Sequence, residues 1–135
     1  VDILSNADLV DLMRAHKDIG SDSTLLVSDR ESSRKLIFDG KMRLTGWHNI
    51  HDDRYKPDGY VFQPGHIEYA FSGIHVVDEK VIDEMLRTEC DSRFSIIDFL
   101  LSSLNNCKIS GYLQKDLNLI DIGKPATLSQ AQFLV

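Results

Sequence analysis

The sequence contains little cysteine, little proline and no long hydrophobic run. Its 135 residues include three prolines and two cysteines, Cys90 and Cys107. The cysteines stand in no C-x-x-C or zinc-type spacing, so the sequence predicts reduced thiols in a cytoplasmic protein rather than a disulfide or zinc framework. No apolar run approaches the roughly 20 residues that a membrane-spanning helix needs. We therefore expect no membrane partner.

Positive charge is also scarce. Fifteen lysines and arginines stand against 21 aspartates and glutamates, which gives a formal net charge of −6. This surplus repels nucleic-acid backbones and anionic membrane surfaces, so neither is an expected partner. A small phosphate-bearing ligand stays compatible with the composition, because it needs only a local group of donors and cations.

Short apolar runs alternate with helical patterns over a length suited to one domain. This alternation predicts an α/β fold with a mixed, mostly parallel sheet and flanking helices. Strands are expected at 23–29, 34–38, 67–77, 108–114 and 118–122, and helices at 9–17, 78–86, 94–106 and 125–134. Ser5 or Asn6 is the expected N-cap of the first helix. The chain opens on "VDIL", a strand pattern. This opening favours the interpretation that the sequence is part of a longer chain.

Two connections have their own signals. Asp39-Gly40 lies between two strand-like runs and predicts a hairpin. Residues 48–66 carry two prolines and two glycines, which predicts a long loop. The segment "HNIHDD" (48–53) could suggest a transition-metal site, but it lacks the required helix, and a solvated polar loop is favoured.

Two aspartates close or follow apolar runs at opposite ends of the chain. Asp2 lies late in the first run and Asp121 ends "NLID". Ligands of open α/β sheets bind beyond the carboxyl ends of strands, where two carboxylates repel and a divalent cation relieves the repulsion. Mg²⁺ suits one or two carboxylates with water and phosphate oxygens. The alternative is that each aspartate caps the following helix.

The strand "AFSGIHVV" carries a glycine in its interior. Gly73 indicates either a bulge or the close approach of a ligand to bare backbone, and the residues leave both open. Its neighbour Ser72 stands in no G-x-S-x-G setting, so hydrolase chemistry is not supported.

Several segments in this order resemble the C-terminal half of sugar-1-phosphate nucleotidyltransferases. They are "VDIL", "AFSGIHV", "FSIIDFLL" and "GYLQKDLNLIDIGKPATLSQA". The likeness is greatest to the mannose-1-phosphate guanylyltransferase and N-acetylmuramate-1-phosphate uridylyltransferase type. "DIGKP" resembles the family's W-x-D-[IT]-G-T-P, with Lys124 in place of threonine and Leu119 in place of tryptophan. The resemblance covers nearly the whole chain apart from 48–66.

The resemblance implies the C-terminal part of a Rossmann-like, GT-A-like domain. Residues 1–135 would form a single partial domain, the sugar-phosphate-binding half, without the N-terminal nucleotide-binding half and its Gly-rich loop. Asp2 and Asp121 would bind Mg²⁺, and Gly73 with Ser72 would contact substrate. The family joins a sugar 1-phosphate to a nucleoside triphosphate and releases pyrophosphate. This chain alone is expected to be inactive; the alternative is a non-catalytic truncated module that binds a sugar phosphate or a protein partner.

Overall fold

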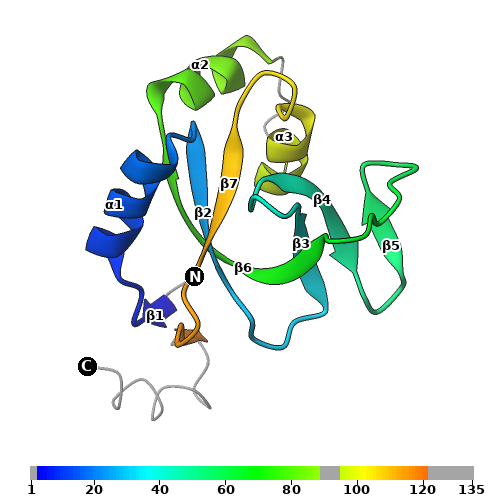
Figure 1. Cartoon of the computed structure of the whole chain (residues 1–135), viewed down its shortest axis with the longest axis horizontal. Coiled ribbons are helices and arrows are strands. Elements are labelled where there is room, and N and C mark those ends of the chain that lie inside the picture. Colours follow the sequence, from blue (N-terminus) through cyan, green and yellow to red (C-terminus); the bar gives the residue numbers. More distant parts are fainter. Residues whose placement is uncertain (1–2, 89–94, 122–135) are drawn as a thin grey trace.

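The computed structural model describes residues 3–88 and 95–121, which form a six-stranded sheet, a two-stranded sheet and three helices (Figure 1). The larger sheet has the order β5-β4-β3-β6-β2-β7. Its strands are β2 (Ser23–Ser28), β3 (Arg34–Phe38), β4 (Leu44–Asn49), β5 (Arg54–Lys56), β6 (Ile67–Val77) and β7 (Ile109–Leu113). The smaller sheet pairs β1 (Ile3–Ser5) with β8 (Leu119–Asp121), and the helices are α1 (Leu9–Ile19), α2 (Glu79–Arg87) and α3 (Ile96–Ser102).

Most strand pairs are antiparallel. In the six-stranded sheet of the described residues, β2 and β7 pair in parallel, and the other four pairings are antiparallel. The predicted mixed α/β character is confirmed, but a mostly parallel sheet is wrong for this part of the chain. Parallel pairing needs a long crossover, usually helical, and the chain from β2 to β6 contains no helix. Only the path from β6 to β7 carries helices α2 and α3 within the described residues.

Strand β6 belongs to both halves of the larger sheet. Its first residues, Ile67–Tyr69, pair with β3, and the rest, from Ala70 to Val77, pairs with β2. The predicted hairpin is confirmed as β3 and β4, although its connection extends beyond Asp39-Gly40 to residue 43.

The helices cover both faces of the strands around β2. All six residues of β2 are buried, and successive side chains point to opposite faces. Leu25 and Val27 join the main core with residues of α2 and α3, whereas Leu26 packs with Leu12 of α1. The run "STLLVS" is therefore buried throughout, because both of its faces are covered.

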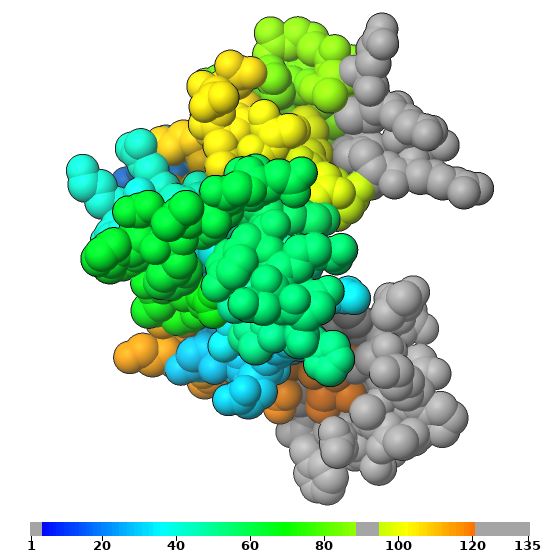
Figure 2. Space-filling model, turned by 90° about the vertical axis from the view of Figure 1, so that its right-hand side faces the viewer, coloured from blue at the N-terminus to red at the C-terminus, as the bar shows by residue number. Residues whose placement is uncertain are grey.

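Residues 48–66 contain more structure than the predicted loop. Strand β5 pairs with β4, and the whole segment lies beneath α3 on the face that Figure 2 presents. His48 belongs to β4 and is buried; its imidazole bonds to Glu68 Oε1 at 2.6 Å and Asp53 Oδ1 at 3.0 Å. The Tyr55 ring stacks on it at 4.0 Å. The solvated-loop interpretation of His48 is therefore wrong. No group of three metal-ligating side chains occurs among the residues described.

The turn of the β3–β4 hairpin docks against β7. The Gly111 N–H donates to the Met42 carbonyl at 2.8 Å, and the Phe38 ring occupies the space above the glycine. A Cβ on Gly111 would lie 2.7 Å from Phe38 Cε1. Glycine at this position therefore lets the sheet curl until the hairpin meets β7.

We expect Gly111→Ala to destabilise the protein by about 1–3 kcal/mol, because a methyl group there overpacks a closed contact. Urea unfolding measures the change. Gly40→Ala is the matched control, since a Cβ on Gly40 meets nothing within 4 Å. Equal stability of both variants would contradict the close contact.

A pH-sensitive hydrogen bond joins α1 to β7. The Tyr112 hydroxyl donates to the Asp11 carboxylate, which also pairs with Arg14. The hydrogen bond from Tyr112 and then that from Arg14 lower the pKa of Asp11, and the same Tyr112–Asp11 bond raises the pKa of Tyr112. The stability from Asp11 is present above its unfolded pKa and is lost as the pH falls through the folded value. The contribution of Tyr112 is present below its unfolded pKa and is lost as the pH rises through the folded value.

Tyr112→Phe should therefore lower stability most at neutral pH. The deficit relative to wild type should shrink below the ordinary aspartate value of 3.8 and above the ordinary tyrosine value of 10.0. Urea unfolding at a series of pH values measures this profile. Tyr69→Phe is the control, because the Tyr69 hydroxyl makes no hydrogen bond to a described residue. A deficit independent of pH would contradict the assignment.

Candidate functional site

The candidate site lies at the carboxyl ends of the parallel strands β2 and β7. Here Gln114 follows β7 and joins it to the segment after β1. Its N–H donates to the Val27 carbonyl at 2.9 Å, and its side chain bonds to the Asp8 N–H at 3.0 Å and the Asn6 carbonyl at 3.1 Å. The two-stranded sheet of β1 and β8 is therefore attached at this edge (Figure 1).

Asn6 fixes the approach to β8. Its side-chain amide donates to the Asp116 carbonyl at 2.8 Å and accepts from the Asn118 N–H at 2.6 Å. The predicted N-cap role of Ser5 or Asn6 is wrong: Asp8 caps α1 by accepting from the Asp11 N–H at 2.9 Å. Asn6 is recruited by a segment more than a hundred residues away, which the local sequence could not indicate.

Asp121 is the last residue of β8, and its backbone pairs with Ile3 of β1. The strands are antiparallel, so the end of β8 lies beside the start of β1, whereas the sequence predicted two carboxyl ends at one edge. Asp2 and residues 122–135, including most of "DIGKP" and the expected final helix, lie outside the described residues. Of the two expected metal ligands, the structure therefore describes one, Asp121, through its backbone position.

Gly73 forms a bulge in β6. Leu25 pairs with His75, but Val27 pairs with Phe71, so β6 has extra residues opposite Leu26. Gly73 has φ of 85° and is exposed, and a Cβ there would meet nothing within 4 Å. The bulge, one of the two alternatives that the sequence left open for Gly73, is confirmed.

Ser72 holds this bulge in place. Its hydroxyl donates to the Leu26 carbonyl at 2.6 Å and accepts from the Ile74 N–H at 3.0 Å, and the residue is buried. Both hydrogen bonds satisfy backbone groups that the bulge removes from the ladder. The hydroxyl therefore orients Gly73, and its bonds within the protein are complete.

One apolar cluster brings the bulge and β8 together. Ile74, next to the bulge, and Leu119 of β8 pack on the cluster formed by Leu12, Leu26 and Leu117. The strand that ends in Asp121 and the strand that carries Gly73 therefore rest on the same side chains. Of the four predicted site residues, the structure brings Gly73, Ser72 and the strand of Asp121 to this edge.

Ser28 is a polar residue that sequence reasoning missed. It ends β2 at this same edge, it is 1% exposed, and its Oγ has no hydrogen-bond partner in the described part of the chain. Unpaired buried hydroxyls are unusual in folded proteins. The sequence did contain a signal for this residue, because Ser28 is a polar residue at the end of the buried run "STLLVS".

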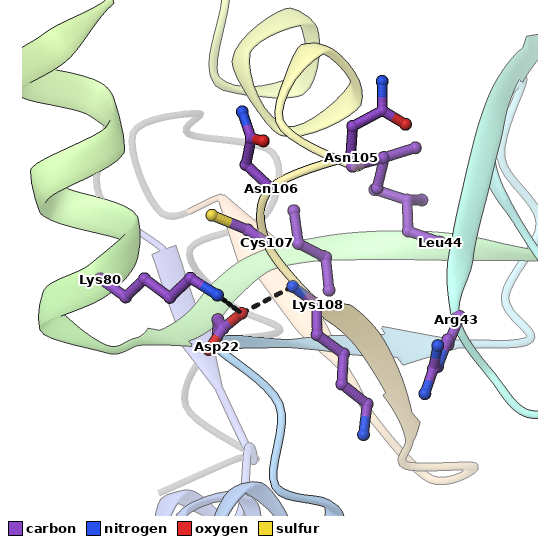
Figure 3. A pocket seen from close by; sticks show the side chains of 10 residues that line it. Asp22, Arg43, Leu44, Lys80, Asn105, Asn106, Cys107 and Lys108 are labelled. Carbon is purple, nitrogen blue, oxygen red and sulfur yellow. Dashed lines mark hydrogen bonds and ion pairs between the residues drawn. The ribbon is translucent and has the colours of Figure 1, made fainter.

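A hollow of about 300 Å³ lies at the opposite end of β2 and β7 (Figure 3). Its charges are largely used within the protein: the Asp22 carboxylate contacts Lys80 Nζ at 3.3 Å and accepts from the Lys108 N–H at 2.7 Å. Burial, followed by nearby carboxylates, raises the pKa of the Cys107 thiol, which disfavours a thiolate. This hollow is best explained as the joint between α2 and β7.

Comparisons with known proteins give a structural match without a sequence match. No protein-family model matches the chain, and no curated protein matches its sequence. A crystal structure of a Bacillus anthracis protein described as a glucose-1-phosphate thymidylyltransferase, in complex with sucrose, superposes with a TM-score of 0.67 at 14% identity. The match covers 98% of this chain and 51% of that protein, so this chain spans about half its length. The fold is thus shared with a nucleotidyltransferase.

Gly73→Ala should destabilise the protein by about 1–2 kcal/mol, because positive φ is costly for a residue with a Cβ. Gly73→Asn should cost less, since asparagine tolerates this backbone conformation better. Urea unfolding of both variants measures the order. A Gly73→Ala variant as stable as wild type would contradict the positive φ at this position.

Proposed function

We propose that this chain is the sugar-phosphate-binding half of a sugar-1-phosphate nucleotidyltransferase, of the mannose-1-phosphate guanylyltransferase or N-acetylmuramate-1-phosphate uridylyltransferase type. The complete enzyme would form a nucleotide sugar from a nucleoside triphosphate and a sugar 1-phosphate and release pyrophosphate. The observation that carries the proposal is the fold shared with a nucleotidyltransferase over 98% of this chain. The nucleotide-binding half would have to come from outside residues 1–135.

The metal ligands in this proposal are Asp2 and Asp121. Asp121 pairs with Ile3, which follows Asp2 directly in the sequence. Aspartate oxygens are ligands that Mg²⁺ prefers. A bound Mg²⁺ supplies charge neutralisation and orientation for phosphate groups.

The residues of β6 would receive the sugar. Gly73 offers exposed backbone with open space above it, and Ser72 fixes the direction of that backbone through its two internal hydrogen bonds. In this arrangement Ser72 positions the bulge, and Gly73 contacts the ligand. A rigid contact of this kind lowers the entropy cost of orienting a phosphate oxygen for in-line attack.

The second candidate is a non-catalytic module that binds a sugar phosphate or a protein partner. It is favoured by the match to only 51% of the nucleotidyltransferase chain. Both candidates predict no pyrophosphate release by residues 1–135, and both allow sugar-phosphate binding. They differ in the metal, because a binding module has no need for a divalent cation.

We expect Asp121→Asn to weaken Mn²⁺ binding in the presence of a sugar 1-phosphate by roughly tenfold or more, because a carboxylate ligand is lost. Titration of the chain with Mn²⁺, followed by electron paramagnetic resonance, measures the affinity. Asp116→Asn is the matched control, since Asp116 is exposed in the turn before β8.

Urea unfolding of both variants, and of Asp121→Ala, separates the alternatives. Unchanged Mn²⁺ affinity of Asp121→Asn, together with lower stability of Asp121→Ala, would support the helix-cap role and remove the metal from the proposal, because asparagine caps a helix as well as aspartate does and alanine does not. Pyrophosphate release by the chain alone would contradict its proposed role as an incomplete half.

A further inference from the structure

A second surface near the bulge carries charges that the proposed function has not yet used. A cavity of about 270 Å³ opens between the loop after β2, the start of β3 and the start of α3. Among the residues that line it are three cations, two aromatic residues and one aliphatic residue: Arg30, Arg34, Lys35, Trp47, Phe71 and Ile97.

The cations at this cavity lack carboxylate partners. Within the described residues, no carboxylate lies within 4 Å of the charged groups of Arg30, Arg34 or Lys35. Arg30 donates to the Phe71 carbonyl at 3.3 Å and leaves its other N–H groups available. In a chain of net charge −6, three such cations around one hollow form a local site for an anion.

Acidic side chains also lie near these cations: Asp29 and Glu31 flank Arg30 in the sequence, and α3 carries Asp98. The Asp98 carboxylate is bound by Lys56 Nζ at 2.8 Å. Lys56 and Arg54 also lie over the Trp47 ring, at 4.9 and 5.8 Å from its centroid. The wall that contains Trp47 is therefore positively charged on more than one side.

The size and walls of the cavity indicate the kind of anion. Its volume lies just below the roughly 300–1,000 Å³ of drug-sized ligand sites, so it suits a phosphate group or a phosphorylated monosaccharide better than a nucleotide. Phe71, which is partly exposed, offers apolar ring surface of the kind that packs on the C–H face of a sugar, and Trp47, which is 9% exposed, lines the cavity from the core. Arginine recognises phosphate through paired N–H groups.

The cavity also lies close to the bulge along the chain. Phe71 precedes Gly73 by two residues on β6, about 7 Å along a strand. Arg30 follows Ser28, the residue with the unpaired hydroxyl, by two positions. The cavity and the bulge therefore share strand β6, although Phe71 packs on the core of α2 and α3 and Ile74, beyond the bulge, packs on the cluster of α1 and β8.

We propose that Arg30 and Arg34 bind the phosphate group of the sugar 1-phosphate in this cavity, with Trp47 and Phe71 beside the sugar. This inference rests on the proposed function for the identity of the ligand. The anion site itself depends on the cavity and its unpaired cations alone.

Calorimetric titration of the chain with α-D-mannose 1-phosphate, α-D-glucose 1-phosphate, free mannose and inorganic phosphate tests the inference. We expect Arg30→Ala and Arg34→Ala each to weaken sugar 1-phosphate binding roughly tenfold, and free mannose to bind far more weakly than its phosphate. Arg43→Ala is the matched control, because Arg43 is an exposed arginine that lines the other hollow. The affinity of Arg43→Ala for the sugar 1-phosphates should equal that of the wild-type chain. Urea unfolding should show that all three variants are as stable as wild type.

Each other outcome identifies what has failed. Unchanged affinity in both Arg30→Ala and Arg34→Ala, with tight binding by wild type, would overturn this inference and leave the proposed function standing. Weaker binding by Arg43→Ala alone would overturn it by placing the ligand in the hollow of Figure 3. Binding of inorganic phosphate that depends on Arg30, without binding of either sugar 1-phosphate, would keep the anion site and overturn the sugar-phosphate assignment. No binding of any phosphate compound at millimolar concentrations would overturn both the anion site and the sugar-phosphate assignment.

Discussion

Strand β6 must hydrogen bond to β3 over its first residues and to β2 over the rest, and this double pairing sets the shape of the sheet. A single regular strand would carry one register along its whole length. The bulge at Gly73 changes the register within the β2 pairing, and Ser72 satisfies the backbone groups that the change leaves unpaired. The strand that joins the two halves of the sheet therefore also exposes bare backbone at the candidate site.

Side-chain amides perform a comparable task at the carboxyl edge. Gln114 and Asn6 connect β7, the start of α1 and the turn before β8 through hydrogen bonds between residues more than a hundred positions apart. These bonds hold a strand of only three residues, β8, in a fixed place. Short strands gain little from their own ladder, so such external bonds decide where Asp121 lies.

Charge is distributed unevenly over a chain that is acidic overall. The hollow beside Asp22 contains the ion pair of Asp22 with Lys80, whereas the three cations at the cavity beside Trp47 have no carboxylate partner among the described residues. This difference separates a structural joint from a surface suited to an anionic ligand. It follows from which elements meet, since both hollows contain similar residue types.

The sequence by itself determined the local elements. The apolar run of β2, the Asp39-Gly40 hairpin, the helices α1 and α2 and the glycine in β6 follow from periodicity, turn chemistry and the absence of a Cβ. Tertiary structure decided the strand directions, the burial of His48 by Glu68 and Asp53, the use of Asn6 as a bridge, and the grouping of Arg30 with Arg34 around Trp47. These features depend on partners distant in the sequence. Periodicity gives the side chains that point inward, but only packing and hydrogen bonding between elements select the groups they meet.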